Sequence, residues 1–120
     1  MSEFFKFVVR VKNLLLVEFF GAEKSVINIG YTTGDLPYKY LGEGLFRVNF
    51  KSLELLAQLE ARKHKIHYTQ ALLTWTVRAC AACMQERMRL AGAPPVPAEV
   101  LSTLCDEWTE TLSTRVIHSA

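Results

Sequence analysis

Residues 5–12 read FKFVVRVK, and this stretch decides how the first half of the chain is interpreted. Every odd position in it is apolar, while Lys6, Arg10 and Lys12 occupy even positions. Side chains that alternate in this way are typical of a β-strand with one buried and one wetter face. We therefore expect the chain to begin with a strand whose solvated face carries these three basic residues.

Three more strands are expected before residue 51, because apolar and β-branched residues recur there between turn-forming residues. They are predicted at residues 14–20, 26–33 and 45–50. The connections are short, or rich in glycine as in the loop at residues 34–44, and short connections favour antiparallel pairing of neighbouring strands. The first fifty residues are therefore predicted to form an antiparallel four-stranded meander.

After Lys51 the apolar residues follow a helical period instead. Helices are predicted over residues 52–63, 68–91 and 97–114. The first has Asn49 or Ser52 as its N-cap candidate, and its apolar face is expected to consist of Leu55, Leu56 and Leu59. The predicted fold is thus α+β, with three helices packed on one face of the meander. It forms a single domain over residues 1–120, with the β-sheet layer at 1–50 and the helical layer at 51–120.

Composition agrees with one folded domain. The chain has 120 residues, of which 50% are hydrophobic and 22% charged, with a net charge of only +2. Residues 51–92 hold seven basic and three acidic residues, whereas residues 93–120 hold one basic and four acidic residues. Helices of opposite charge can simply pair with each other. The sequence shows no signal peptide and three cysteines, an odd number, so we expect a cytoplasmic protein without disulfides and no association with a membrane.

Two pairs of side chains have the residue types of a zinc site, His64 with His67 and Cys80 with Cys83. On one unbroken helix the pairs would lie about 24 Å apart, whereas zinc bonds are about 2.0–2.3 Å long. We therefore expect no metal and no cofactor. The cysteines lie in apolar helical stripes away from any base, and no catalytic constellation or phosphate-binding loop is evident, so an enzyme is not expected either.

The helix predicted over residues 68–91 is unusually apolar, because Arg78 is the only charged residue between Ala71 and Met84. A helix that is apolar all round has to be covered all round. One interpretation is that it is the central core helix of a monomer. The other, which we favour, is that it supports self-association as a homodimer. The residues of that interface would be Trp75 as a large anchor and the small residues Ala79, Ala82 and Cys83.

The leading functional hypothesis is a non-enzymatic protein-interaction module, a small accessory, regulatory or inhibitory protein that occupies a surface of a partner protein. Tyrosine and tryptophan dominate protein interfaces, and the long loop and its borders are rich in tyrosine. The partner-binding residues would be Tyr31, Tyr38, Lys39 and Tyr40.

The alternative is a nucleic-acid-binding protein, since basic residues interleaved with aromatic rings on a sheet are typical of single-strand binding. Its contacts would come from Lys6, Arg10, Lys12 and Arg47 on the sheet and from Arg62 and Lys63 at the end of the first helix. Steep loss of binding with salt would distinguish it from an apolar protein interface.

Overall fold

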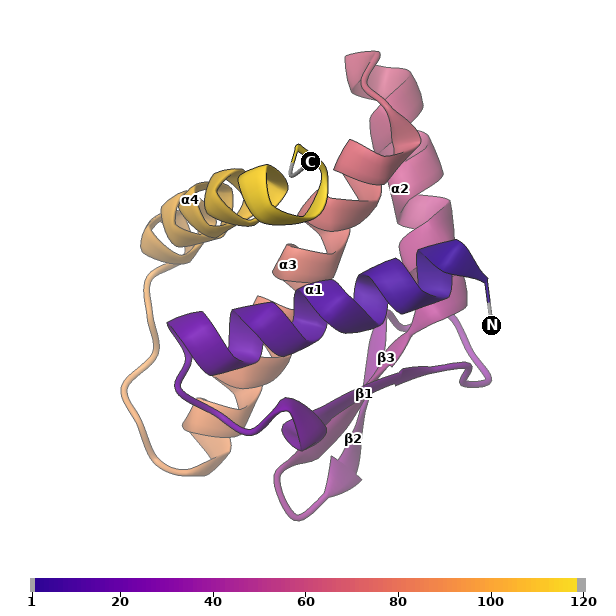
Figure 1. Cartoon of the computed structure of the whole chain (residues 1–120). Helices are drawn as coiled ribbons and strands as arrows, with labels where there is room; N and C mark the ends of the chain where they lie inside the picture. Colours follow the sequence, from indigo (N-terminus) through magenta and orange to yellow (C-terminus); the bar gives the residue numbers. More distant parts are fainter. Residues whose placement is uncertain (1, 119–120) are drawn as a thin grey trace.

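The structure is a computed structural model that describes residues 2–118 (Figure 1). Within them the chain forms four α-helices, one short 3₁₀ helix and a three-stranded sheet. In chain order these are α1 (Glu3–Phe19), η1 (Lys24–Val26), β1 (Ile27–Gly30), β2 (Tyr38–Gly42), β3 (Leu45–Asn49), α2 (Phe50–His64), α3 (Tyr68–Leu90) and α4 (Ala98–Val116).

The two strands predicted at residues 5–12 and 14–20 are wrong, because both segments belong to helix α1. The hydroxyl of Ser2 caps this helix by accepting a hydrogen bond from the main-chain N–H of Phe5 at 3.0 Å. Its buried positions are spaced three and four residues apart, as a helix requires. They are Val8, Val11, Lys12, Leu15 and Leu16. The alternation within FKFVVRVK extends over little more than two helical turns. The helical spacing of the buried residues continues further along the chain, to Leu16, and it determines the structure.

The predicted four-stranded antiparallel meander is also wrong. The sheet has three strands in the order β1-β3-β2, with β1 parallel to β3 and β2 antiparallel to β3. Strand β2 lies inside the segment predicted as a loop. It is joined to β3 by a tight turn in which Gly42 and Gly44 have φ values of +92° and +78°, which glycine adopts most easily. Strand β3, the last strand in the sequence, therefore occupies the centre of the sheet.

Helices α2, α3 and α4 lie close to the three ranges expected after Lys51. The side chain of Asn49 caps α2 by accepting a hydrogen bond from the main-chain N–H of Lys51 at 3.2 Å. At the other end of α2, Lys65 adopts a left-handed conformation that turns the chain into α3.

The core lies between the inner face of the sheet and the helices, with α3 at its centre. Helix α3 packs against α1, α2 and α4 and also touches β3 (Figure 1). Phe46 and Val48 of β3 and Ile27 of β1 are fully buried. Because α1 packs with α3 and α4, the expected division into a β layer at 1–50 and a helical layer at 51–120 does not hold.

In the view of Figure 1, α3 runs between α2 and α4, so the basic end of α2 and the acidic α4 are set on different sides of it. Of the remaining basic residues, Arg78, Arg87 and Arg89 lie on α3, which packs directly against the acidic α4. Of the helices in residues 2–118, none combines the length and the apolar character needed to cross a membrane.

Candidate protein-interaction surface

Helix α2 buries a different face from the one expected. Its buried residues are Phe50, Leu53 and Ala57. Leu55 and Leu59, which were predicted to face the core, are 54% and 61% exposed. The helix thus carries two apolar stripes, and only one can contact α3. Both stripes can be recognised in the sequence. Because a helix at the edge of a small domain cannot bury two faces, one of them was bound to remain exposed.

The exposed stripe continues onto neighbouring elements. Leu36, in the loop between β1 and β2, is also strongly exposed. Leu55 and Leu56 of α2 and Trp75 of α3 line a groove of about 720 Å³, and the two sequence neighbours of Leu36 line it as well. We call this set the α2 surface; it consists of Leu36, Leu55, Leu56, Leu59 and Trp75. The remaining groove residues are Thr32, Thr33, Gly34, Asp35, Pro37, Asn49, Lys51 and Ser52.

Trp75 is half-buried in this groove, and its ring is contacted by one charged side chain, that of Arg78. The indole Nε1 atom is buried and has no hydrogen-bond partner among the described residues. The guanidinium carbon of Arg78 lies 4.9 Å from the centroid of the ring, a cation–π distance. Arg78 therefore holds one face of Trp75, and the rest of the ring is available to the groove.

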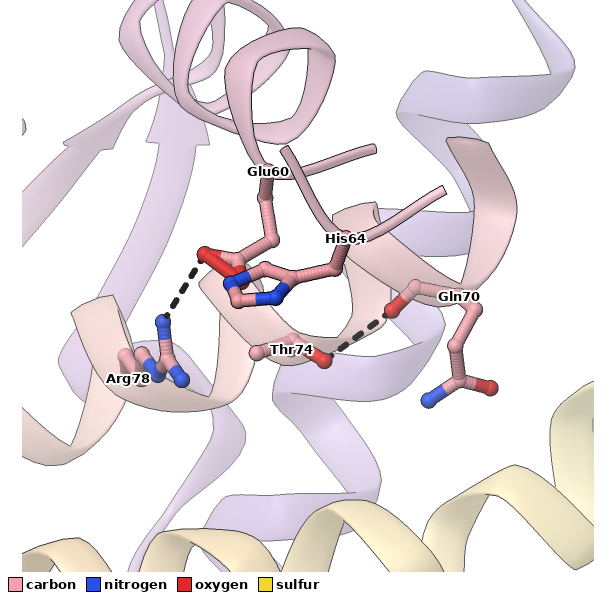
Figure 2. A network of polar contacts seen from close by, with 5 residues as sticks. All are labelled: Glu60, His64, Gln70, Thr74 and Arg78. Atoms are coloured by element: carbon pink, nitrogen blue, oxygen red, sulfur yellow. Dashed lines mark hydrogen bonds and ion pairs between the residues drawn. The ribbon is translucent and has the colours of Figure 1, made fainter. Parts of the chain in front are cut away.

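Arg78 is in turn held by Glu60 of α2, as Figure 2 shows. The Oε1 atom of Glu60 lies 3.5 Å from the Nη1 atom of Arg78, and its Oε2 atom lies 3.0 Å from the Nε2 atom of His64. On the α3 side, the hydroxyl of Thr74 donates to the main-chain oxygen of Gln70 at 3.1 Å. The contact between Glu60 and Arg78 connects α2 to α3, whereas the other two contacts each lie within one helix.

Positive charge flanks the α2 surface at both ends. Lys51 is exposed at the start of α2. At its end Arg62, Lys63 and Lys65 are exposed as well. The leucines lie between Lys51, which shares the groove with Asp35, and the three cations at the end of the helix. A partner with apolar side chains in the middle and carboxylates at its ends is therefore the best electrostatic match.

The four residues predicted for self-association differ in burial, and they fall into two pairs. Ala79 and Cys83 are buried in the protein's own core and are not available to a second copy. Trp75 and Ala82 are half-buried. Their spacing along α3 is that of one helical face, but of the two only Trp75 lines the groove of the α2 surface.

The residues predicted for partner binding are also not brought to one surface. Tyr31 is exposed, and its ring centroid lies 6.0 Å from that of Phe50 at the start of α2. Tyr38 and Tyr40 both pack their rings on Phe46, at 6.0 Å and 5.0 Å. Lys39 lies between them in β2, so it points to the opposite face of the sheet.

The predicted solvated face of Lys6, Arg10 and Lys12 is wrong, because these residues lie on a helix. Lys6 and Arg10 are exposed on α1. Lys12 is only 6% exposed, and its Nζ atom donates a hydrogen bond to the main-chain oxygen of Lys24 at 2.7 Å. Burial lowers the pKa of the Lys12 ammonium.

Arg47 lies on the outer face of the sheet, where its Nε atom donates to Oδ1 of Asn28 at 2.9 Å. Lys39 is its cross-strand neighbour. Tyr38 and Tyr40, however, belong to the inner face with Phe46. Basic and aromatic side chains thus occupy opposite faces of the sheet, and the stacking platform on which the nucleic-acid hypothesis depends is not assembled.

The three cysteines are buried thiols. Burial raises the pKa of Cys80 to about 12 and also raises the pKa of Cys83 and of Cys105. His64 and His67 are exposed, so the two pairs considered for zinc lie in different environments. Residues 2–118 contain no group of three or more histidine, cysteine or acidic side chains placed to hold a metal ion.

Comparison with known proteins finds no match to this chain among protein-family models, curated proteins or solved structures.

Proposed function

We propose that this chain is a non-enzymatic protein-interaction module whose α2 surface binds an amphipathic segment of another protein, with apolar anchors at its centre and acidic flanks. It would act as a small accessory or regulatory protein by occupying that segment. The observation that carries the proposal is the exposure of Leu55 and Leu59 beside the groove of Trp75. Apolar residues clustered next to a groove and rimmed by charge are typical of interaction sites.

The charges around the α2 surface favour another protein over a second copy. If two copies paired their α2 helices in antiparallel fashion, Lys51 of one would approach Lys63 of the other. A parallel pair would bring the basic ends of both helices together. In either arrangement cations face cations, and such juxtapositions are unfavourable. Acidic flanks on the partner remove this repulsion.

The surface is large enough for binding of moderate strength. Full burial of one leucine side chain is worth about 1.5–3 kcal/mol, and Trp75 adds a large anchor that is already positioned by Arg78. Part of this gain is offset by ordering of the partner. We therefore expect dissociation constants in the micromolar range, which correspond to about 8 kcal/mol.

The test uses two synthetic amphipathic peptides of about 18 residues, long enough to form a helix, with the same leucine spacing and either glutamate or lysine flanks. Fluorescence anisotropy of the labelled peptides measures binding. We expect the glutamate peptide to bind at least about tenfold more tightly than the lysine peptide, and the preference to reverse in the variant with Arg62→Glu and Lys63→Glu.

The apolar contribution is tested with the variant that carries Leu55→Ser and Leu59→Ser, which should keep its helical content and lose binding. Val100→Ser is the matched control, since Val100 is 48% exposed on α4, away from the α2 surface. The proposal fails if neither peptide binds, or if Val100→Ser weakens binding as much as the leucine changes do. Sedimentation distinguishes a second copy as partner, because a wild-type dimer that the leucine changes dissociate would replace the proposed partner.

A further inference from the structure

In Figure 1 the end of α1, the second half of α3, the connector at residues 91–97 and α4 lie near one another. A second, separate pocket is lined by these four parts of the chain. We call it the α1–α4 pocket. Its volume is about 410 Å³, within the usual range for small-molecule sites. Its lining residues are Phe19, Phe20, Ala81, Gln85, Glu86, Met88, Arg89, Pro94, Pro95, Val96, Leu101, Leu104 and Trp108. None of them belongs to the α2 surface.

One wall of the pocket is aromatic. The ring centroid of Trp108 lies 5.7 Å from that of Phe19 and 5.1 Å from that of Phe20, and the pair with Phe20 is edge-to-face. Trp108 and both phenylalanines are only half-buried, so ring surface remains uncovered by the protein. Ring edges and faces arranged in this way are complementary to another flat aromatic molecule.

The polar group in this pocket without a partner is the side-chain amide of Gln85. Its Oε1 atom is buried and accepts no hydrogen bond from the described residues. A buried acceptor left unpaired is unfavourable. Gln85 lines the pocket, and no hydrogen bond from the described residues holds its Oε1 atom in place. A ligand that carries an N–H or O–H group there would supply the missing bond.

The charges at the pocket already neutralise each other. Among the lining residues, the ionisable ones are Glu86 and Arg89. The Nε atom of Arg89 donates to Oε2 of Glu86 at 3.0 Å, and a second contact joins Nη2 to Oε1 at 2.5 Å. The pocket thus offers no free charge to an ionic ligand, and its walls favour a neutral one.

We propose that the α1–α4 pocket is a binding site for a small neutral aromatic molecule that carries one hydrogen-bond donor. The aromatic wall holds the ring, and the apolar residues of α3, the connector and α4 exclude water. The amide of Gln85 turns about its last bond when the ligand binds, and its oxygen then accepts from the donor. This site goes beyond the proposed interaction function, and it does not depend on the α2 surface.

Indole and 1-methylindole are the probes, because they have nearly the same shape and only indole has an N–H donor. The chain has two tryptophans, so a ¹⁵N-labelled sample gives two side-chain N–H signals in an NMR spectrum. Trp108 lies in the pocket and Trp75 on the α2 surface, and Trp75→Phe assigns them. Indole should shift the Trp108 signal in a saturable way and leave that of Trp75 in place. We expect 1-methylindole to bind about fivefold more weakly, as expected for loss of one hydrogen bond.

Two variants complete the test. Gln85→Leu should make the affinities for the two probes equal, since it removes the acceptor and keeps the pocket apolar. Leu104→Trp should fill the pocket and prevent binding of both, whereas Val100→Ser should leave both unchanged. If Leu104→Trp does not fold, the wild-type titration and Gln85→Leu still decide. Failure of indole to shift Trp108 at its solubility limit, equal shifts of both tryptophans, or an unchanged preference in Gln85→Leu would each overturn the proposal.

Discussion

The Nζ atom of Lys12 donates a hydrogen bond to the main-chain oxygen of Lys24 at 2.7 Å, and this bond ties the middle of α1 to the turn that precedes β1. The long side chain of Lys12 runs through apolar surroundings on the buried face of the helix. Desolvation of the ammonium is the main reason that its pKa is lowered. A basic residue thus holds a position in the core that a sequence pattern assigns to the solvated face.

Reversal of this charge should be far more damaging than reversal at the exposed positions of the same helix. In Lys12→Glu a buried carboxylate would face the oxygen of Lys24, and we expect a loss of about 3 kcal/mol or more in the free energy of unfolding. Lys6→Glu should change it by no more than about 0.5 kcal/mol. Lys12→Met keeps the volume of the side chain without its charge, and its loss of free energy of unfolding should lie between those of the two glutamate variants. Urea unfolding monitored by circular dichroism measures all three, and equal values for Lys12→Glu and Lys6→Glu would contradict the burial of Lys12.

The thiol of Cys80 should make the protein less stable in alkaline solution. Burial raises its pKa in the folded protein from 9.0 to about 12. Above pH 9 the unfolded chain therefore releases a proton that the folded protein keeps, so the free energy of unfolding falls as pH rises toward 12. At pH 10 the loss amounts to about 1.4 kcal/mol, and below about pH 8 this thiol has almost no effect.

Cys80→Ala removes this contribution together with the electrostatic interaction between the thiol and Lys12, while the other ionisable groups remain in the variant. Its free energy of unfolding is expected to be lower at pH 7, since a cavity replaces the sulfur, but to decline less between pH 8 and pH 10. Denaturant unfolding at a series of pH values compares the two slopes. Parallel curves for wild type and variant would show that the thiol is not buried as described.

Gly44 in the turn between β2 and β3 should not tolerate a side chain. Its φ is +78°, and a Cβ atom there would lie 3.3 Å from Nε of Arg87, which itself donates to the oxygen of Gly44 at 3.0 Å. We expect Gly44→Ala to cost about 1–3 kcal/mol. Gly21→Ala is the matched control: its φ is also positive, at +59°, but no atom lies within 4 Å of the added methyl group. A similar cost for both in thermal unfolding would show that Arg87 does not press on the turn.

The contact between Glu60 and Arg78 should contribute measurably but modestly to the packing of α2 on α3. The Glu60 side chain is largely shielded, whereas that of Arg78 is 40% exposed, so solvent weakens their attraction. A double-mutant cycle with Glu60→Gln and Arg78→Met should give a coupling energy of about 0.5–1 kcal/mol. This coupling should shrink in 1 M salt, and a value of zero at low salt would contradict the network in Figure 2.

The sequence predicted the later elements better than the earlier ones, for a physical reason. Helices α2, α3 and α4 are bounded by strong local signals, such as the Asn49 cap and the connector at residues 91–97 with its prolines. In α1 the stretch FKFVVRVK satisfies both periods, and aromatic and β-branched residues favour a strand locally. The helix is identified only by the helical spacing of its buried residues, which continues through Leu15 and Leu16. That spacing determines the structure once other elements pack against this face.

The candidate site was harder to predict than the helices. The sequence draws attention to its tryptophan and tyrosine residues, but which of them reach the surface depends on tertiary packing. The groove joins Trp75 to a loop more than 35 positions earlier in the sequence, and no local pattern encodes that proximity. The outward leucines of α2 are a different case. Two stripes on one helix are visible in the sequence, and the choice between them depends on α3.

The central place of α3 in the core also has a consequence during synthesis on the ribosome. Strand β1 leaves the exit tunnel before either of the other strands, and the apolar face of α1 waits for α3, which follows about 60 residues later. At about 5–20 residues per second this delay lasts about 3–12 s. Throughout that interval the nascent chain presents Val8, Val11 and Leu15 to the surrounding solution without their final neighbours. A ribosome-associated chaperone would therefore have the most exposed apolar side chains to bind while the first half of the chain is emerging.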